Sequence, residues 1–217
     1  MSSDEATLHK QLVEGLTQLQ LRLSDHQINQ LLAFQALIAK WTKVYNLTAV
    51  RDPAEMLTHH LLDSLAVIAP LQKQMTKGSL LDVGSGAGLP GVVIAICCPV
   101  ICVTCVDTVA KKATFIKQVA LELKLPNLVG LHARVENLAQ PFDVICSRAF
   151  ASLVDFTQWS ASALAQSGAW MAMKGRHPGE ELAALSADID VFHVEQLQVP
   201  GLDAERCVVW MRKKSVS

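Results

Sequence analysis

The first 70 residues carry apolar positions at helical spacing. Ser24 and Gln27 form a capping-box pattern, and apolar residues then recur three or four positions apart. A second helix start follows at Asp52 with proline directly after it, and its apolar stripe continues to Pro70. This pattern predicts a helical extension over residues 1–70.

After that extension, short β-rich runs alternate with helical patterns, which predicts one α/β domain over residues 71–217. Strands are expected at residues 79–83, 100–106, 127–133, 142–147 and 168–173. Helices are expected at residues 90–98, 108–123 and 151–166. This alternation of strands and helices predicts that the first five strands form a parallel sheet. Residues 190–199 and 205–213 are strand-like with no helix between them, which predicts an antiparallel hairpin that closes the sheet.

Composition adds few constraints on function. The chain has 217 residues, a hydrophobic content of 51% and a net charge of −1, so any site for a polyanion must be a local basic patch. The N-terminus lacks the basic start and apolar run of a signal peptide. Residues 83–106 carry no charge, but prolines and glycines interrupt them, and we expect no membrane segment.

The six cysteines sit mostly in apolar runs, where a cysteine acts as a small buried hydrophobe. Cys102 and Cys105 have the spacing of a zinc or redox pair. On a strand, however, positions three apart point to opposite faces and cannot share a metal. We therefore expect no metal site, and reduced thiols suit a cytoplasmic protein.

A glycine-rich loop follows the first predicted strand, in the stretch "LLDVGSGAGLPGVVIAI" (80–96). Such a turn lets backbone N–H groups approach a ligand. Gly86, Gly88 and Gly91 match the dinucleotide-binding pattern, and Asp107 follows at the end of the next strand, where it could bind a ribose. The loop alone therefore allows a nicotinamide-dependent enzyme or another nucleotide-binding module.

Three features favour a different ligand. Asp82 precedes the glycines, where its charge would repel a pyrophosphate but could meet the cationic end of an amino acid. A long helical segment precedes the first strand, and the sheet ends in a hairpin. Together these features resemble the class I S-adenosylmethionine-dependent methyltransferases, whose Rossmann-like sheet has seven strands with the last one antiparallel.

Six separated stretches carry a closer resemblance. They are "KVYNLTAVRDPAEMLTHHLLDSL" (43–65), "LLDVGSGAGLPG" (80–91), "ARVENL" (133–138), "FDVICSRAFASL" (142–153), "MKGR" (173–176) and "LQVPGLDAERCVV" (197–209). From about residue 20 to the end, the chain resembles the RsmG family, also called GidB. These bacterial enzymes methylate N7 of a guanine in 16S ribosomal RNA.

The resemblance implies S-adenosylmethionine as the cofactor and a set of residues that bind it. Asp107 would take the ribose by the superfamily's usual geometry. The other implied cofactor-binding residues are Gly84, Gly86, Leu89, Val135, Glu136 and Arg148. The substitutions within the motifs, such as Ser85, Ala87 and Cys146, are conservative.

The implied chemistry needs no general base, because guanine N7 carries a lone pair and no proton. Arg148 is then expected to position the reactants rather than to move a proton. Cys146 could be a nucleophile only for methylation of a pyrimidine C5, and its apolar strand favours packing. Phe150 could stack on a flipped guanine or belong to the core. His60 could be structural or, like Asn46 and Thr48, help to form the target pocket.

The implied partner is 16S ribosomal RNA, within the small subunit or its precursor, and we expect a monomer. Candidate RNA contacts are Lys40, Lys43, Arg51, Lys174, Arg176, Arg206, Arg212, Lys213 and Lys214. With so little net charge, we expect weak binding to naked RNA, so that an assembled particle presents the guanine. A methyltransferase of the same fold that acts on a small molecule or a protein is the alternative.

Overall fold

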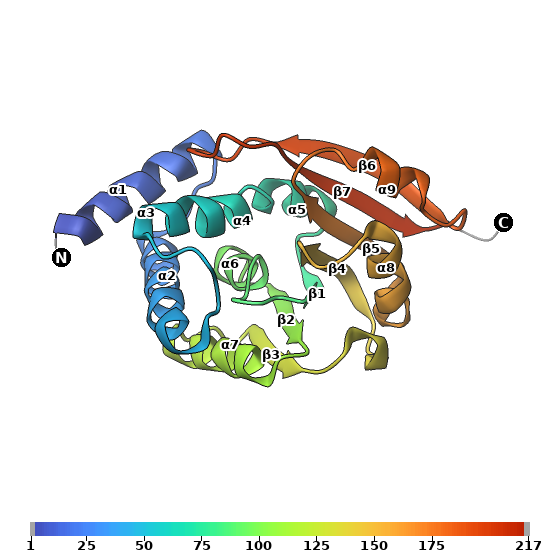
Figure 1. Ribbon diagram of the computed structural model, residues 1–217, viewed down its shortest axis with the longest axis horizontal. Coiled ribbons are helices and arrows are strands. Elements are labelled where there is room, and N and C mark those ends of the chain that lie inside the picture. The colour runs from blue at the N-terminus through green and yellow to red at the C-terminus, as the bar shows by residue number, and fades with distance from the viewer. Residues whose placement is uncertain (1–2, 215–217) are drawn as a thin grey trace.

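The computed structural model describes residues 3–214, in which a seven-stranded sheet is covered by helices on both faces (Figure 1). The strand order is β3-β2-β1-β4-β5-β7-β6. The strands are β1 (Gly78–Val83), β2 (Ile101–Asp107), β3 (Leu128–His132), β4 (Phe142–Arg148), β5 (Leu164–Lys174), β6 (Ile189–Leu197) and β7 (Arg206–Lys213). β1 to β5 are parallel, and β7 runs antiparallel to both of its neighbours, β5 and β6. The predicted closing hairpin is confirmed.

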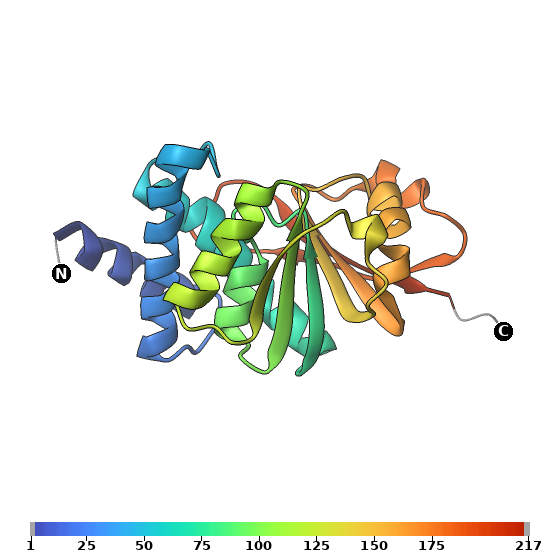
Figure 2. The ribbon, with the colours of Figure 1, turned by 90° about the horizontal axis from the view of Figure 1, so that it is seen from below.

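The helices divide between the two faces of the sheet (Figure 2). Those before the sheet are α1 (Ser3–Gln18), α2 (Asp25–Tyr45), α3 (Pro53–Met56), the π-helical turn η1 (Leu57–Leu62), α4 (Asp63–Leu65) and α5 (Ile68–Gln74). Those within it are α6 (Gly91–Cys97), α7 (Ala110–Glu122), the 3₁₀ turn η2 (Val135–Asn137), α8 (Leu153–Ser160), the 3₁₀ turn η3 (Ala161–Ala163) and α9 (Gly179–Ala183). The helices α1 to α7 share one apolar core, and α8 and α9 cover a second.

The central strands explain this division, because alternate residues of a strand face opposite sides. Leu80 of β1 is buried in the core under the N-terminal helices, and the next residue, Leu81, is buried under α8. Such two-sided burial requires the nearly continuous apolar runs by which the strands were recognised.

The N-terminal helices dock on the sheet through polar links as well as apolar packing. Ser24 and Gln27 form the predicted capping box at the start of α2. The Gln27 side chain also donates to the carbonyl of Ile96 at 2.8 Å, and Gln30 donates to the carbonyl of Leu123 at 2.7 Å. These bonds tie α2 to the ends of α6 and α7. The domain boundary at residue 70 stays a prediction, and α5 runs across it.

Three predicted boundaries were wrong by four residues or more. The apolar stripe does not end at Pro70, which lies in the first turn of α5, where a missing N–H costs no helical hydrogen bond. The helix predicted to reach residue 166 ends at Ser160, whose hydroxyl donates to Phe156 O and accepts from the Trp170 indole at 2.9 Å. The chain then enters β5 at Leu164, which pairs with Phe142, so this strand begins four residues before its predicted start at residue 168. The other four strands predicted for the parallel sheet begin and end within one residue of the expected positions.

Candidate functional site

Two cavities open at the carboxyl ends of β1, β2 and β4 and meet at Gly84, which lines both. The larger has a volume of about 490 Å³ and the smaller about 300 Å³. All seven residues predicted to bind the cofactor line one of them. Gly84, Gly86, Leu89 and Arg148 line the larger cavity, and Gly84, Asp107, Val135 and Glu136 line the smaller.

The glycine loop uses its own N–H groups internally. Within residues 84–89, only the N–H of Ala87 lacks a hydrogen-bond partner in the described part of the chain. Gly84 and Ser85 donate to Val106 O at 2.9 and 3.2 Å, Gly86 donates to Asp107 Oδ2 at 3.0 Å, and Gly88 and Leu89 donate to Ser85 O at 2.7 and 3.1 Å. Five of the six N–H groups are therefore already bonded within the protein, and the turn offers a ligand fewer donors than the sequence suggested. A pyrophosphate would need those donors, so the loop is a poor phosphate cradle.

The two loop glycines at the cavities serve different purposes. Both have positive φ, +65° at Gly84 and +58° at Gly86, a conformation that favours glycine. A Cβ on Gly84 would overlap the ring of Phe150, whereas a Cβ on Gly86 would meet nothing closer than 3.9 Å. Gly84 therefore makes room for a side chain of the protein, and Gly86 leaves open space beside the larger cavity.

Asp82 lies beneath the loop and not in either cavity. Its side chain is fully buried, and Oδ2 accepts from the Gly91 N–H at 2.8 Å, which holds the start of α6. Burial raises the pKa of Asp82 to about 7. The expectation that this carboxylate meets the cationic end of a ligand is wrong as a direct contact. Cys105 and Cys146 are buried beside Asp82, and burial raises the pKa of both thiols, which disfavours Cys146 as a nucleophile.

The smaller cavity presents two carboxylates. Asp107 accepts from the Gly86 N–H through Oδ2 and from the Val109 N–H at 2.9 Å through Oδ1, and Lys112 Nζ lies 3.6 Å from Oδ2. Because each carboxylate oxygen has two lone pairs, both can still accept a hydroxyl. Glu136 is more exposed and pairs with Arg134 at 3.0 Å. Its own backbone N–H, and then Arg134, lower the pKa of Glu136.

Two aromatic side chains line the smaller cavity. Phe150 packs edge-to-face against Phe156 and Trp159, with ring centroids 6.4 and 5.9 Å apart. Phe150 does not line the larger cavity, so the structure gives no support to stacking on a guanine there. Trp159 was not predicted as a site residue, although it is 39% exposed.

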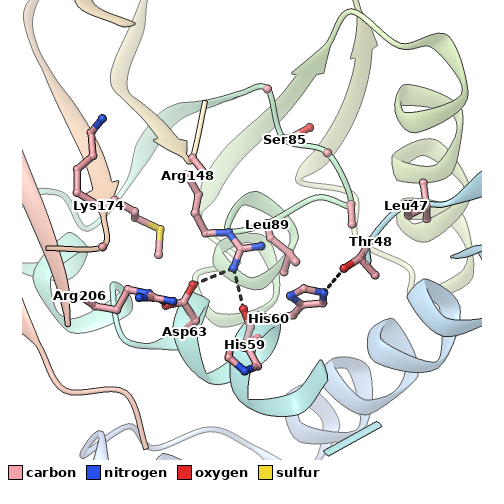
Figure 3. A pocket seen from close by; sticks show the side chains of 16 residues that line it. Leu47, Thr48, His59, His60, Asp63, Ser85, Leu89, Arg148, Lys174 and Arg206 are labelled. Carbon is pink, nitrogen blue, oxygen red and sulfur yellow. Dashed lines mark hydrogen bonds and ion pairs between the residues drawn. The ribbon is translucent and has the colours of Figure 1, made fainter. Parts of the chain in front are cut away.

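Arg148 extends from the end of β4 into the larger cavity (Figure 3). Its Nη1 donates to Asp63 Oδ2 at 2.8 Å and to His59 O at 2.9 Å. Arg206, at the start of β7, donates from Nε to the other carboxylate oxygen of Asp63 at 2.8 Å. The prediction did not single out Asp63 or His59. The only signal for Asp63 was an acid within the mostly apolar "LLDSL" stretch.

His60 and Thr48 form the opposite wall of the larger cavity, with Nε2 of His60 2.8 Å from the Thr48 hydroxyl. Burial lowers the pKa of His60, so the ring is neutral near pH 7. Asn46 caps α2 in a left-handed conformation and accepts from Arg51 at 2.9 Å. It lines neither cavity, which places it outside the predicted target pocket.

The candidate RNA contacts fall into separate groups. Lys174 and Arg206 line the larger cavity. Arg212 and Lys213 lie at the other end of β7, because this strand is antiparallel, and are therefore remote from the cavities. Lys174 is also neutralised by Glu181, at 2.8 Å.

Neither a metal cluster nor a membrane span is found in residues 3–214. No group of three or more His, Cys, Asp or Glu side chains there could hold a metal ion. Over the same residues, no helix has both the length and the apolar character needed to cross a membrane.

Comparison with known proteins identifies the fold and the family. A SAM-dependent methyltransferase from Aquifex aeolicus superposes with a TM-score of 0.53 at 17% identity, over 74% of this chain and 98% of that one. With the seven-stranded sheet and its antiparallel last strand, this confirms the class I, Rossmann-like methyltransferase fold.

Relatives of high identity carry one name. The chain is 68% identical to the ribosomal RNA small subunit methyltransferase G of Polaromonas naphthalenivorans, over 99% of this chain and 100% of the relative. It is 71% identical to the protein of the same name from Polaromonas sp. strain JS666, over 94% and 92%. The model of the GidB family, described as rRNA small subunit methyltransferase G, matches residues 27–209, and the chain belongs to this family.

Proposed function

We propose that this protein transfers a methyl group from S-adenosylmethionine to N7 of one guanine in the 16S RNA of the small ribosomal subunit. Membership of the GidB family and the shared name of its relatives support a methyltransferase that acts on this RNA. The observation that carries the choice of cofactor is the glycine loop, whose N–H groups are engaged internally. S-adenosylmethionine has a ribose and an amino-acid end but no phosphate, so it does not need them.

The two cavities fit the two halves of this cofactor. Asp107 and Glu136 offer carboxylates to the ribose hydroxyls, and the nearby aromatic rings offer flat surfaces to an adenine. Gly86, with open space above its Cα, and Leu89 would border the methionine part. Arg148 is suited to the methionine carboxylate, because a guanidinium pairs with carboxylates through parallel hydrogen bonds. When bound, S-adenosylmethionine supplies a methyl group on a positively charged sulfur.

The chain's own residues then have to position the reactants. Guanine N7 attacks with its lone pair and loses no proton, so no side chain has to act as a base. The carboxylate of Asp63 is already held by two arginines, and His60 is held by Thr48. Catalysis would rest on the alignment of N7 with the methyl group and on the exclusion of water from the larger cavity.

We further propose that the protein acts in the cytoplasm as a monomer and on an assembled subunit or its precursor. The net charge is −1, and the cations at the larger cavity are paired with Asp63 or Glu181. Few unpaired cations are left at this cavity to bind RNA phosphates, so ribosomal proteins and RNA folding would have to present the guanine. Methylation of small subunits should be much faster than methylation of protein-free 16S RNA. Equal rates would reject this part of the proposal.

The central test uses purified protein, labelled S-adenosylmethionine and small subunits that lack the modification. Mapping of 7-methylguanosine should show one newly modified position in 16S RNA; methylation elsewhere, or none, would contradict the proposal. Arg148→Ala should weaken cofactor binding about tenfold to a hundredfold in calorimetry, as expected for the loss of hydrogen bonds to a charged group. Arg212→Ala is the matched control, because Arg212 forms a similar 2.8 Å pair with Asp190 far from both cavities.

A further inference from the structure

Asp63 joins two arginines that come from distant parts of the chain. Its side chain accepts from Arg148 at the end of β4 and from Arg206 at the start of β7, each at 2.8 Å (Figure 3). The two arginines are bound through different carboxylate oxygens. Asp63 is therefore the point at which α4, β4 and β7 are fastened together beside the larger cavity.

The burial of Asp63 makes this arrangement costly to disturb. The residue is only 3% exposed, and a buried carboxylate is stable only when its charge is compensated and its oxygens are hydrogen-bonded. The two arginines supply both requirements and leave the trio with one net positive charge. With 22% and 24% of their side chains exposed, they also keep a face toward the solvent or a ligand.

The bonds to Arg148 fix the direction of its guanidinium. Nη1 is occupied twice, by the Asp63 carboxylate and by the His59 carbonyl. Both acceptors come from the π-helical turn η1 and the residue that follows it. Among residues 3–214, Nε and Nη2 of Arg148 have no hydrogen-bond partner, and Arg148 lines the larger cavity. Nη1 of Arg148 is thus anchored, and Nε and Nη2 remain available to a ligand.

An arginine without such an anchor would have to lose most of its side-chain freedom when a ligand binds. The conformational entropy of a free arginine side chain amounts to about 2 kcal/mol. A ligand that orders the side chain must offset this cost when it binds. An anchored guanidinium has already lost it in the folded protein. Holding Arg148 in advance therefore favours the ligand's affinity without any contact between Asp63 and the ligand.

We propose that Asp63 is a positioning residue that holds Arg148 ready for the methyl donor, with Arg206 as the second cation that compensates its buried charge. The inference rests on the cofactor role proposed above for Arg148. It assigns to Asp63 an effect on cofactor affinity, transmitted through Arg148, and no contact with the reacting atoms.

Asp63→Asn tests the proposal, because it keeps the size of the side chain and removes its charge. Calorimetry with S-adenosylmethionine should show affinity about tenfold weaker, as expected when a hydrogen bond loses its charged partner. Asp190→Asn is the matched control. It removes the carboxylate of the Arg212 pair, also 2.8 Å long, at a site remote from the cavities, and should leave the affinity unchanged.

A double-mutant cycle separates positioning from a merely structural role. If Asp63 acts through Arg148, the double variant Asp63→Asn, Arg148→Ala should bind the cofactor no more weakly than Arg148→Ala alone. Additive losses would overturn the proposal, because Asp63 would then act independently of Arg148. If thermal unfolding shows that Asp63→Asn does not fold, Asp63→Glu takes its place. It displaces the carboxylate by one methylene and should also weaken binding, and unchanged affinity would overturn the proposal.

The outcomes also distinguish this inference from the proposed function. Normal cofactor affinity in Arg148→Ala would remove the role of Arg148 itself. Weak binding in Arg148→Ala together with normal binding in Asp63→Asn would reject only the positioning role of Asp63.

Discussion

The two cavities share Gly84 but are built in different ways. The smaller one is formed at the ends of β1, β2, β3 and β4, strands that follow one another in the sequence. The larger one also needs the turn η1 from the N-terminal helices and the first residue of β7, near the end of the chain. One cavity is thus a product of the parallel sheet, and the other depends on what packs around the sheet.

The chemistry of the cavities differs in the same way. In the smaller cavity, the carboxylate of Asp107 lies near aromatic side chains, which suits hydroxyls and a flat ring. In the larger cavity, charged groups are already paired with one another, and the trio around Asp63 has one net positive charge. An anionic end of a ligand is therefore favoured in the larger cavity, and a sugar and a base in the smaller one.

The largest effect is expected beneath the loop that both cavities share. Burial raises the pKa of Asp82 from 3.8 to about 7, so the folded protein binds an extra proton between these values. The contribution of Asp82 to the free energy of unfolding should therefore fall as the pH rises from about 4 to about 7, and level off above that. The total is on the order of 4 kcal/mol at 1.4 kcal/mol per unit.

Urea unfolding at several pH values would measure this slope. Asp82→Asn cannot titrate, while its amide oxygen can still accept from Gly91, so the variant should lose the slope. Asp190→Asn, which leaves Asp82 in place, should keep it. If Asp82→Asn shows the wild-type pH dependence, another group carries the effect.

The next effect distinguishes Gly84 from Gly86, the two loop glycines at the cavities. Gly84→Ala places a methyl group against Phe150 in a residue with positive φ, and should cost about 3 kcal/mol of stability from strain and overpacking combined. Gly86→Ala has the same backbone strain but open space, and should cost only about 1–2 kcal/mol. Thermal unfolding of both variants compares them directly.

Cofactor binding gives a second comparison of Gly84→Ala with Gly86→Ala. Phe150 lines the smaller cavity, so a displacement of its ring by the new methyl group at Gly84 should change the shape of that cavity and weaken cofactor binding. Equal losses of stability in the two alanine variants would show that Phe150 yields freely, and the two glycines would then be equivalent.

The smaller cavity was largely predictable from the sequence. The carboxyl ends of parallel strands meet at one edge of a sheet, so Asp107 of the smaller cavity could be placed at that edge from strand boundaries alone, as could Arg148 of the larger one. The capping residues Ser24 and Asp52 were also recognisable, because a cap depends only on residues within one helical turn.

The charged trio in the larger cavity was not predictable, because its members are far apart in the sequence and are joined only by packing. Asp63 meets Arg206 only because β7 inserts next to β5 and runs antiparallel, so that its first residue reaches this edge. The partners of the loop N–H groups were hidden for a similar reason. Val106 and Asp107 belong to the neighbouring strand, and nothing in the loop itself indicates that they accept its hydrogen bonds.

The smallest effect concerns Trp159, whose partly exposed ring lines the smaller cavity. If an adenine lies there, Trp159→Ala should weaken cofactor binding by about 1 kcal/mol, or about fivefold, which is typical of one aromatic contact. Trp159→Phe should keep most of the affinity because it retains a flat ring. Methylation kinetics should show an unchanged KM for the small subunit in both variants, since Trp159 does not line the larger cavity. The fluorescence of Trp159 should also respond to the cofactor, and Trp159→Phe should remove that response. A raised KM for the subunit with unchanged cofactor affinity would reverse the assignment of the two cavities.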